Sequence, residues 1–137
     1  MKTVTSDSGL LDELLAEGYE FFTGVPDSGL KTFISDLSRL PAGRHVTATW
    51  EAEAVGIGVG ASLAGAKACV YLQNAGLGHT INPLASLCIP YDIDLLLVVG
   101  HRHTLPQHRV MGEIDARLVE LVGWDNCIIV AGENNEG

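Results

Sequence analysis

Short runs of almost entirely apolar residues recur along this chain, and segments with helical spacing separate them. The clearest runs are residues 68–73, 93–100 and 126–131. A strand with apolar residues at nearly every position has to be covered on both faces, which is typical of parallel sheets in α/β proteins. Alternating strands and helices joined by right-handed crossovers build such a sheet. The sequence therefore predicts an α/β fold with a mainly parallel sheet and helices on both faces.

The remaining segments complete this pattern within a single domain of 137 residues. Further strands are predicted at 19–23 and 45–50, and helices at 8–17, after residue 28, and at 52–65, 81–87 and 114–122. Ser6, Asp7 or Ser8 can cap the first helix, and Asp27 or Ser28 the second. The polar residues 132–137 are expected to form a frayed tail.

The predicted helix 52–65 is small and apolar nearly all round, which fits close packing against a sheet or another subunit. Its glycines, Gly56, Gly58 and Gly60, lie inside the helix rather than in a strand-to-helix turn. The next strand ends at Gln73 and Asn74, without an acidic residue for a ribose hydroxyl. We therefore reject a dinucleotide-binding motif and attribute the glycines to close packing.

The charge of the chain argues against some classes of binding partner. With 17 acidic and 8 basic residues the net charge is −9, so the chain has no basic stripe for nucleic acid and would be repelled by an acidic membrane. Residues 1–8 lack the apolar core of a secretion signal, and we expect a cytoplasmic location. The cysteines, Cys69, Cys88 and Cys127, are interpreted as small core residues rather than disulfide partners or zinc ligands.

Polar residues at two strand ends indicate a ligand site. Gln73 and Asn74, followed by Gly76 and Gly78, stand where a parallel strand ends, and ligands bind at that edge of α/β sheets. Glu51 stands between a strand and an apolar helix, where a partly desolvated carboxyl can share a proton. Helix N-terminal acids that interact with the helix dipole show the same pattern, so that interpretation stays open. Glu53 is a candidate for either role.

The segment HRHTLPQH, at 101–108, is interpreted as a loop that follows a strand. Its three histidines, His101, His103 and His108, could ligate a metal, but Arg102 and Arg109 disfavour a bound cation. An anionic substrate suits these groups better, and a solvated loop is the alternative.

Four segments together resemble one family: 21–31 (FFTGVPDSGLK), 49–58 (TWEAEAVGIG), 71–87 (YLQNAGLGHTINPLASL) and 100–112 (GHRHTLPQHRVMG). They are similar to the pyrimidine-binding domain of thiamine-diphosphate-dependent decarboxylases, specifically the phosphonopyruvate and sulfopyruvate decarboxylases. The resemblance covers almost the whole chain. It implies decarboxylation of a small anionic 2-oxo acid to an aldehyde and carbon dioxide, with 3-phosphonopyruvate as the first expectation and sulfopyruvate as the alternative.

The resemblance also implies roles for individual residues. The catalytic glutamate that hydrogen-bonds the cofactor's aminopyrimidine matches Glu51, where it favours the tautomer that deprotonates the thiazolium carbon. The other residues expected to approach the cofactor are Gln73, Asn74, Gly76, Gly78 and Pro26. Those expected to bind or orient substrate are Asp27, Ser28, His79, Gln107, His108 and Arg102, with Arg109 as a further candidate. His79 departs from the family, which usually has asparagine there.

The resemblance accounts for only half of an active site. The chain has no Gly-Asp-Gly to Asn segment, which in the family holds Mg²⁺ and the diphosphate. We therefore expect a separate β subunit to supply these groups, and helix 52–65 is a candidate contact surface. Two alternatives stay open: a non-catalytic regulatory or scaffold subunit, and a stand-alone binder of small anions.

Overall fold

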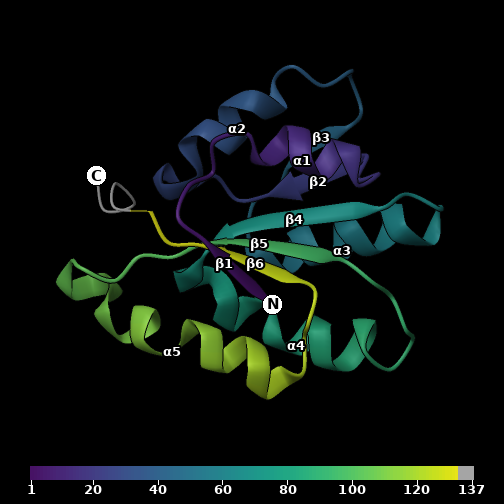
Figure 1. Ribbon diagram of the computed structural model, residues 1–137. Coiled ribbons are helices and arrows are strands. Elements are labelled where there is room, and N and C mark those ends of the chain that lie inside the picture. The colour runs from purple at the N-terminus through teal and green to yellow at the C-terminus, as the bar shows by residue number, and fades with distance from the viewer. Residues whose placement is uncertain (133–137) are drawn as a thin grey trace.

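The computed structural model, which describes residues 1–132, contains one six-stranded sheet in the order β1-β6-β5-β4-β2-β3 (Figure 1). Every neighbouring pair of strands is parallel. The strands are β1 (Lys2–Val4), β2 (Phe21–Gly24), β3 (His45–Thr47), β4 (Ala68–Gln73), β5 (Leu96–Gly100) and β6 (Cys127–Val130). The predicted α/β class with a parallel sheet is confirmed.

Helices cover both faces of the sheet, as predicted (Figure 1). In chain order they are α1 (Leu10–Ala16), η1 (Ser28–Leu30), α2 (Lys31–Leu37), α3 (Glu51–Leu63), η2 (Asn74–His79), α4 (Ile81–Pro83), η3 (Leu84–Cys88) and α5 (Pro106–Val122). Helices α1 and α2 lie on one face, and α3, α4 and α5 on the other.

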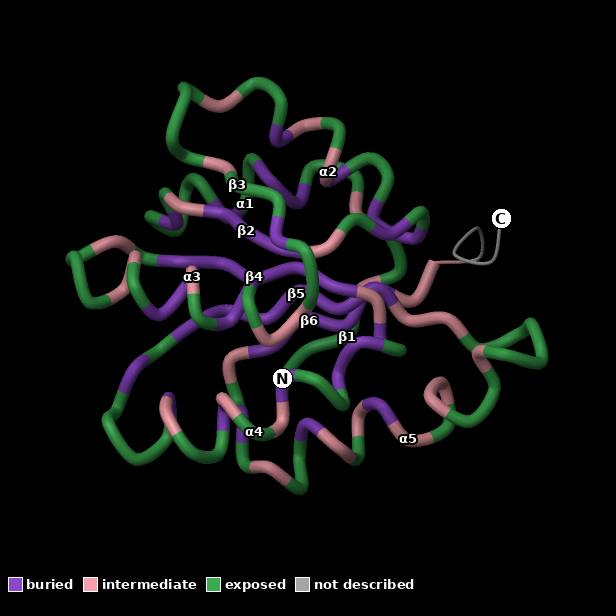
Figure 2. The backbone as a smooth tube through the Cα atoms, turned by 180° about the vertical axis from the view of Figure 1, so that it is seen from behind, coloured by how far each residue is buried: buried purple, intermediate pink, exposed green. Residues whose placement is uncertain are grey.

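Strand β4 shows why the central strands are apolar throughout. Cys69 and Tyr71 pack into the core under α1 and α2, whereas Val70 and Leu72 pack into the core on the opposite face. All four residues are fully buried, and Figure 2 shows the tube of β4 in the colour of buried residues. Because successive side chains of a strand point to opposite faces, a sheet covered on both sides needs apolar residues at every position.

The N-terminal region differs from the prediction in two ways. Strand β1 was not predicted, since it has only three residues and its pairing with β6 leaves no local pattern. None of the predicted side-chain caps serves α1, whose N-cap is Gly9 with φ of 73°. Asp7 instead accepts a hydrogen bond from the backbone N–H of Phe33 in α2, at 2.9 Å. The predicted cap at Asp27 is confirmed, since its side chain accepts from the N–H of Gly29.

The boundaries of several other elements also differ. Strand β3 ends at Thr47, three residues before the predicted end, and β5 begins at Leu96 rather than at residue 93. The predicted helix 81–87 is α4 followed by a π-helical turn. Helix α5 begins at Pro106 rather than at 114, so His108 lies in a helix and not in the predicted loop. Proline suits a first helical turn because its missing N–H would be unpaired there anyway.

Gly132 follows β6, and residues 133–137 of the predicted tail lie outside the described residues.

Only one of the three interior glycines of α3 is closely packed. A Cβ at Gly58 would lie 2.9 Å from Val70 Cγ2 and 3.2 Å from Leu95 Cδ2. A Cβ at Gly56 or Gly60 would meet nothing within 4 Å, and both residues are exposed. Close packing against the sheet is therefore confirmed for Gly58, whereas Gly56 and Gly60 do not pack within this chain, and for them contact with another subunit stays a prediction.

This difference gives a test by substitution. Gly56→Ala should stabilise the chain by about 0.5–1 kcal/mol, because alanine loses less backbone entropy in a helix. Gly58→Ala should destabilise it by about 1–3 kcal/mol, because the added methyl overpacks the core. Urea unfolding of both variants measures the two free energies. Equal effects of the two substitutions would contradict this packing of α3.

The three cysteines are buried and unpaired, as predicted. Burial raises the pKa of the Cys127 thiol to about 12 and also raises the pKa of Cys69. In the unfolded chain both thiols ionise near pH 9, so the unfolded state binds fewer protons than the folded state above that pH. We expect the free energy of unfolding to fall from pH 9 upwards, by as much as about 1.4 kcal/mol per pH unit and thiol.

Urea unfolding between pH 7 and pH 11 checks this expectation, with Cys127→Ala as the comparison. That variant should lose stability less steeply above pH 9. An equal slope in both proteins would mean that the Cys127 thiol contributes nothing to alkaline unfolding, while Tyr19 and Tyr71, whose pKa values burial also raises, remain as the other titrating groups.

Candidate active site

The carboxyl ends of β2, β4 and β5 meet at one edge of the sheet. Gly24 pairs with Tyr71, and Gln73 pairs with Gly100, so the segments that follow these strands start side by side. Most of the predicted site residues lie in those segments or in the first turns of α3 and α5. They form two clusters, one around Glu51 and one around Asp27, joined through residues 73–79.

Glu51 is the first residue of α3, and its side chain is directed against η2. A Cβ at Gly76 would lie 2.4 Å from Glu51 Cγ and Oε1, so only glycine permits this approach. His79 Nδ1 lies 3.0 Å from Glu51 Oε2, and its ring stands edge-on to Trp50 at 5.6 Å. The Glu51 side chain is 15% exposed. The carboxyl is therefore largely desolvated, yet it remains accessible from the edge of the sheet.

Glu53 has a different role. Its carboxylate accepts hydrogen bonds from the backbone N–H of Thr49 at 2.9 Å and from the Thr49 hydroxyl at 3.1 Å. These bonds join the first turn of α3 to Thr49, the residue before the N-cap Trp50, whose own side chain makes no capping hydrogen bond. The geometry thus separates the two acids, because Glu53 stabilises the helix terminus and Glu51 reaches the loop after β4.

Asp27 is the centre of the second cluster. Its carboxylate accepts from Gln73 Nε2 at 2.9 Å and from Gly29 N–H at 3.1 Å, and Arg102 Nη1 lies 3.5 Å away. A Cβ at Gly100 would come within 2.5 Å of Asp27 Oδ2. The Asp27 side chain is 1% exposed and that of Arg102 is 12% exposed. Gln73 and Arg102 therefore hold a buried carboxylate rather than facing solvent.

A third group, which includes residues that the sequence analysis missed, lies behind this cluster. Asp115 of α5 is buried, and its Oδ2 lies 2.5 Å from His101 Nδ1 and 3.0 Å from Asn74 Nδ2. Asn74 Nδ2 also donates to the backbone carbonyl of Arg102. Because a carboxylate only accepts, His101 donates its Nδ1 proton and its orientation is fixed. Asn74 is fully buried, and its Nδ2 connects the end of β4 to α5, while its Oδ1 has no hydrogen-bond partner among residues 1–132.

The other predicted residues are more exposed. Pro26 and Ser28 flank Asp27, and Gly78 is exposed within η2. Gln107 is exposed and His108 half-buried, both in the first turn of α5. A helix N-terminus carries partial positive charge and unpaired N–H groups, so this turn favours an anion. Asp115 could not be identified from the sequence, because it occupies an ordinary position inside a helix and no motif surrounds it.

Several proteins of known function are similar in sequence to most of this chain. The chain is 35% identical over 113 residues to the sulfopyruvate decarboxylase subunit alpha of Methanococcus maripaludis, covering 80% of this chain and 68% of that subunit. It is 36% identical over 112 residues to the subunit alpha of Methanothermobacter thermautotrophicus, covering 76% and 67%. It is also 37% identical over 125 residues to the phosphonopyruvate decarboxylase of Streptomyces viridochromogenes, covering 88% of this chain but 32% of that enzyme. No model of a protein family matches the sequence.

The fold and these similarities define a decarboxylase of the lyase class. More particularly, the chain belongs to the family of the sulfopyruvate decarboxylase alpha subunits and the phosphonopyruvate decarboxylases. It spans about two thirds of the alpha subunits and about one third of the Streptomyces enzyme.

The residues present fit one half of thiamine diphosphate. Glu51, with the close approach of Gly76, offers a partly desolvated carboxyl to an aminopyrimidine. Within residues 1–132 no three His, Cys, Asp or Glu side chains gather as a metal site would require. The described helices also include none long and apolar enough to cross a bilayer.

Proposed function

We propose that this chain is the α subunit of a thiamine-diphosphate-dependent 2-oxo acid decarboxylase. The observation that carries the proposal is the position of Glu51, held at the carboxyl edge of the sheet between Gly76 and His79. When bound, thiamine diphosphate supplies the electron sink for decarboxylation.

In this proposal Glu51 binds the aminopyrimidine and exchanges a proton with its ring nitrogen. His79 donates to Glu51 Oε2 and thereby orients the carboxyl, so that Oε1 is directed to the ring. Asp27 and His101, each fixed by buried partners, are the candidates for moving protons at the substrate. Asn74, which we expected at the cofactor, instead supports His101 through Asp115.

A β subunit supplies the diphosphate and Mg²⁺ site in this proposal. The name "subunit alpha" of the relatives supports a partner, and α3 offers a surface for it. One face of this helix is exposed. It contains Gly56, Gly60 and Leu63, which are spaced four and three residues apart, and Leu63 is 72% exposed. Trp50, at the start of the same helix, is 50% exposed. We place the complex in the cytoplasm.

The substrate that we propose is 3-phosphonopyruvate, with sulfopyruvate as the alternative. Relatives named for both substrates match this chain at nearly equal identity, 37% for the Streptomyces phosphonopyruvate decarboxylase and 35% for the Methanococcus subunit, so only a direct assay of both acids separates them. Because Arg102 is largely buried against Asp27, we assign the anionic tail to Gln107, His108 and Arg109 in the first turn of α5.

The test is an assay of carbon dioxide release from both acids by this chain mixed with a protein from the same organism that carries the Gly-Asp-Gly to Asn segment. We expect turnover only in the mixture, and faster turnover of the phosphonate. Faster turnover of the sulfonate would favour the alternative substrate. A mixture that binds no cofactor and releases no carbon dioxide would favour a regulatory or scaffold subunit. Tight binding of phosphonates by the isolated chain without cofactor would favour a stand-alone anion binder.

A further inference from the structure

The two carboxyl oxygens of Glu51 face different neighbours. Oε1 is directed to the position of Gly76, where an added Cβ would collide with it, and Oε2 lies 3.0 Å from Nδ1 of His79. The side chain is only 15% exposed, so water has little access to it. A ring bound at Oε1, as we propose, leaves Oε2 as the oxygen through which Glu51 regains or loses a proton.

His79 connects this carboxyl to the surface of the molecule. It is the last residue of η2, and its side chain is 58% exposed. The end of η2 is fixed by the fully buried Thr80, whose backbone N–H and hydroxyl both donate to the Leu77 carbonyl, at 2.9 and 2.7 Å. The indole of Trp50 stands edge-on to the imidazole, with the ring centres 5.6 Å apart. While Nδ1 contacts Glu51, Nε2 has no hydrogen-bond partner among residues 1–132.

Within the described part of the chain, no second acid bonds to this imidazole. Helices α3, α4 and α5 pack against η2. Glu53 of α3 bonds to Thr49, and Asp115 of α5 bonds to His101. Helix α4 contains no titratable residue. The exposed imidazole and the desolvated carboxyl of Glu51 therefore form a pair of their own.

We propose that His79 is a proton relay between Glu51 and solvent, and this proposal rests on the decarboxylase function proposed above. When Glu51 passes a proton from Oε1 to the ring nitrogen, His79 gives its Nδ1 proton to Oε2 and takes up a proton at Nε2 from solvent. The Nδ1–H bond breaks while the Oε2–H and Nε2–H bonds form, and the reverse transfer carries a proton out. An imidazole suits this role because one nitrogen donates while the other accepts. His79 acts through Glu51 and is therefore a positioning residue that also replaces the proton.

The isolated chain tests the pairing without any cofactor. The ¹⁵N shifts of an imidazole show which nitrogen carries the proton, and His79→Asn identifies the His79 signals among the five histidines. At about pH 8.5, where an ordinary imidazole is neutral, we expect a protonated Nδ1 in the wild type and a mixture of both tautomers in Glu51→Ala. A proton on Nε2 in the wild type, or the same tautomer in both proteins, would overturn the proposal.

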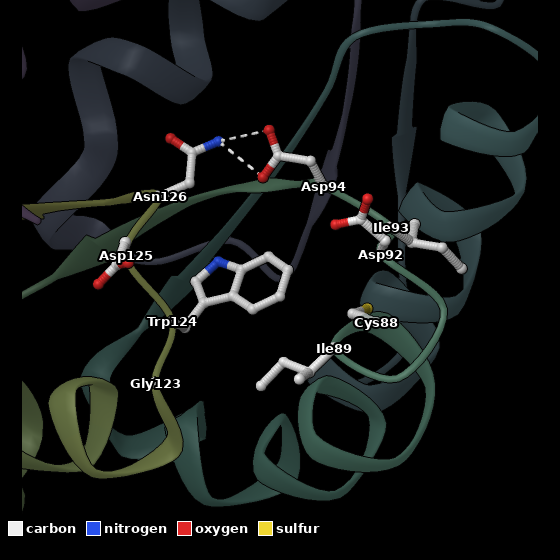
Figure 3. Close-up of a pocket in the computed structure, with 9 residues that line it drawn as sticks. All are labelled: Cys88, Ile89, Asp92, Ile93, Asp94, Gly123, Trp124, Asp125 and Asn126. Atoms are coloured by element: carbon white, nitrogen blue, oxygen red, sulfur yellow. Dashed lines mark hydrogen bonds between the residues drawn. The ribbon is translucent and has the colours of Figure 1, made fainter.

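The two tryptophans serve as controls for folding. Trp124 lines a hollow at the amino edge of the sheet, at the opposite end of the strands from His79 (Figure 3). Its indole N–H signal should keep its position in both variants, whereas the signal of Trp50, which contacts His79, should move. Gly76→Ala, which displaces the same carboxyl, is the second variant and should change the tautomer in the same direction as Glu51→Ala.

The α/β mixture with thiamine diphosphate tests the relay itself, through exchange of the C2 proton of the cofactor into deuterium oxide. At low buffer concentration we expect exchange about tenfold slower in His79→Asn, a smaller loss than the about 100-fold of a direct acid–base group, because water replaces the relay in part. Asparagine can still donate to Oε2, so it orients Glu51 but cannot carry a proton. Added imidazole should restore the rate of the variant and leave the wild type unchanged, a response that a purely structural role would not give.

Two kinds of failure are distinguishable. Equal exchange rates in the wild type and His79→Asn, or a variant rate that does not respond to imidazole, would overturn the relay and leave the decarboxylase function in place. A wild-type mixture that binds no cofactor would overturn the proposed function and the relay together, even where the isolated chain shows the pair of His79 and Glu51.

Discussion

Glu51→Gln is expected to lower the turnover of the α/β mixture by about 100- to 10,000-fold, the usual contribution of a positioned acid-base group. Glutamine preserves the size of the side chain and can still contact His79, but it cannot exchange a proton with the aminopyrimidine. Glu51 lies against Gly76 at the edge of the sheet and is not part of the hydrophobic core, so the substitution should leave folding and subunit assembly intact. Steady-state assays together with size-exclusion chromatography measure both quantities.

Glu53→Gln is the matched control, two residues further along the same helix. Its carboxylate bonds only to Thr49 among the contacts given by the structure of residues 1–132. The substitution should cost less than about 1 kcal/mol of stability, through a weaker helix cap, and should leave the rate near that of the wild type. If Glu53→Gln lost as much activity as Glu51→Gln, the assignment of the two acids would be wrong.

Gly76→Ala is expected to reduce turnover by about 100-fold without unfolding the protein. The added methyl would occupy the position of the Glu51 side chain, whose Cγ and Oε1 lie 2.4 Å from it. The side chain can move, so the fold persists, but a displacement of about 1 Å at a reacting group is enough for a loss of this size. In the isolated chain, NMR signals of the His79 imidazole should shift because its partner has moved.

Gly78→Ala is the comparison, because it lies in the same segment and a Cβ there meets nothing within 4 Å. It should leave the His79 signals of the isolated chain unchanged. Equal shifts of those signals in the two variants would show that any alanine distorts the loop, whereas full activity of Gly76→Ala would show that the position of Glu51 tolerates displacement.

Much of the fold was predictable because the sequence patterns that produce it, such as apolar runs and helical spacing, are local or periodic. The apolar run of β4 requires burial on both faces, and that requirement alone predicts a parallel sheet between two layers of helices. The positions of Gln73 and Gly100 at one edge follow from the same rule, since parallel strands align their carboxyl ends. Strand β1 was not predictable, because three exposed or half-exposed residues gain their structure only by pairing with β6.

The sequence by itself determined the α/β class and, through its motifs, the decarboxylase family, and it predicts a ligand site at the carboxyl edge of the sheet. The family resemblance favours Glu51 over Glu53, and only the tertiary structure shows how their contacts differ, because Glu51 lies against Gly76 of η2 whereas Glu53 bonds to Thr49. It likewise placed Asn74 behind the site, joined to Asp115. These contacts connect residues 25 to 41 positions apart, and such pairings depend on how the layers pack rather than on neighbouring residues.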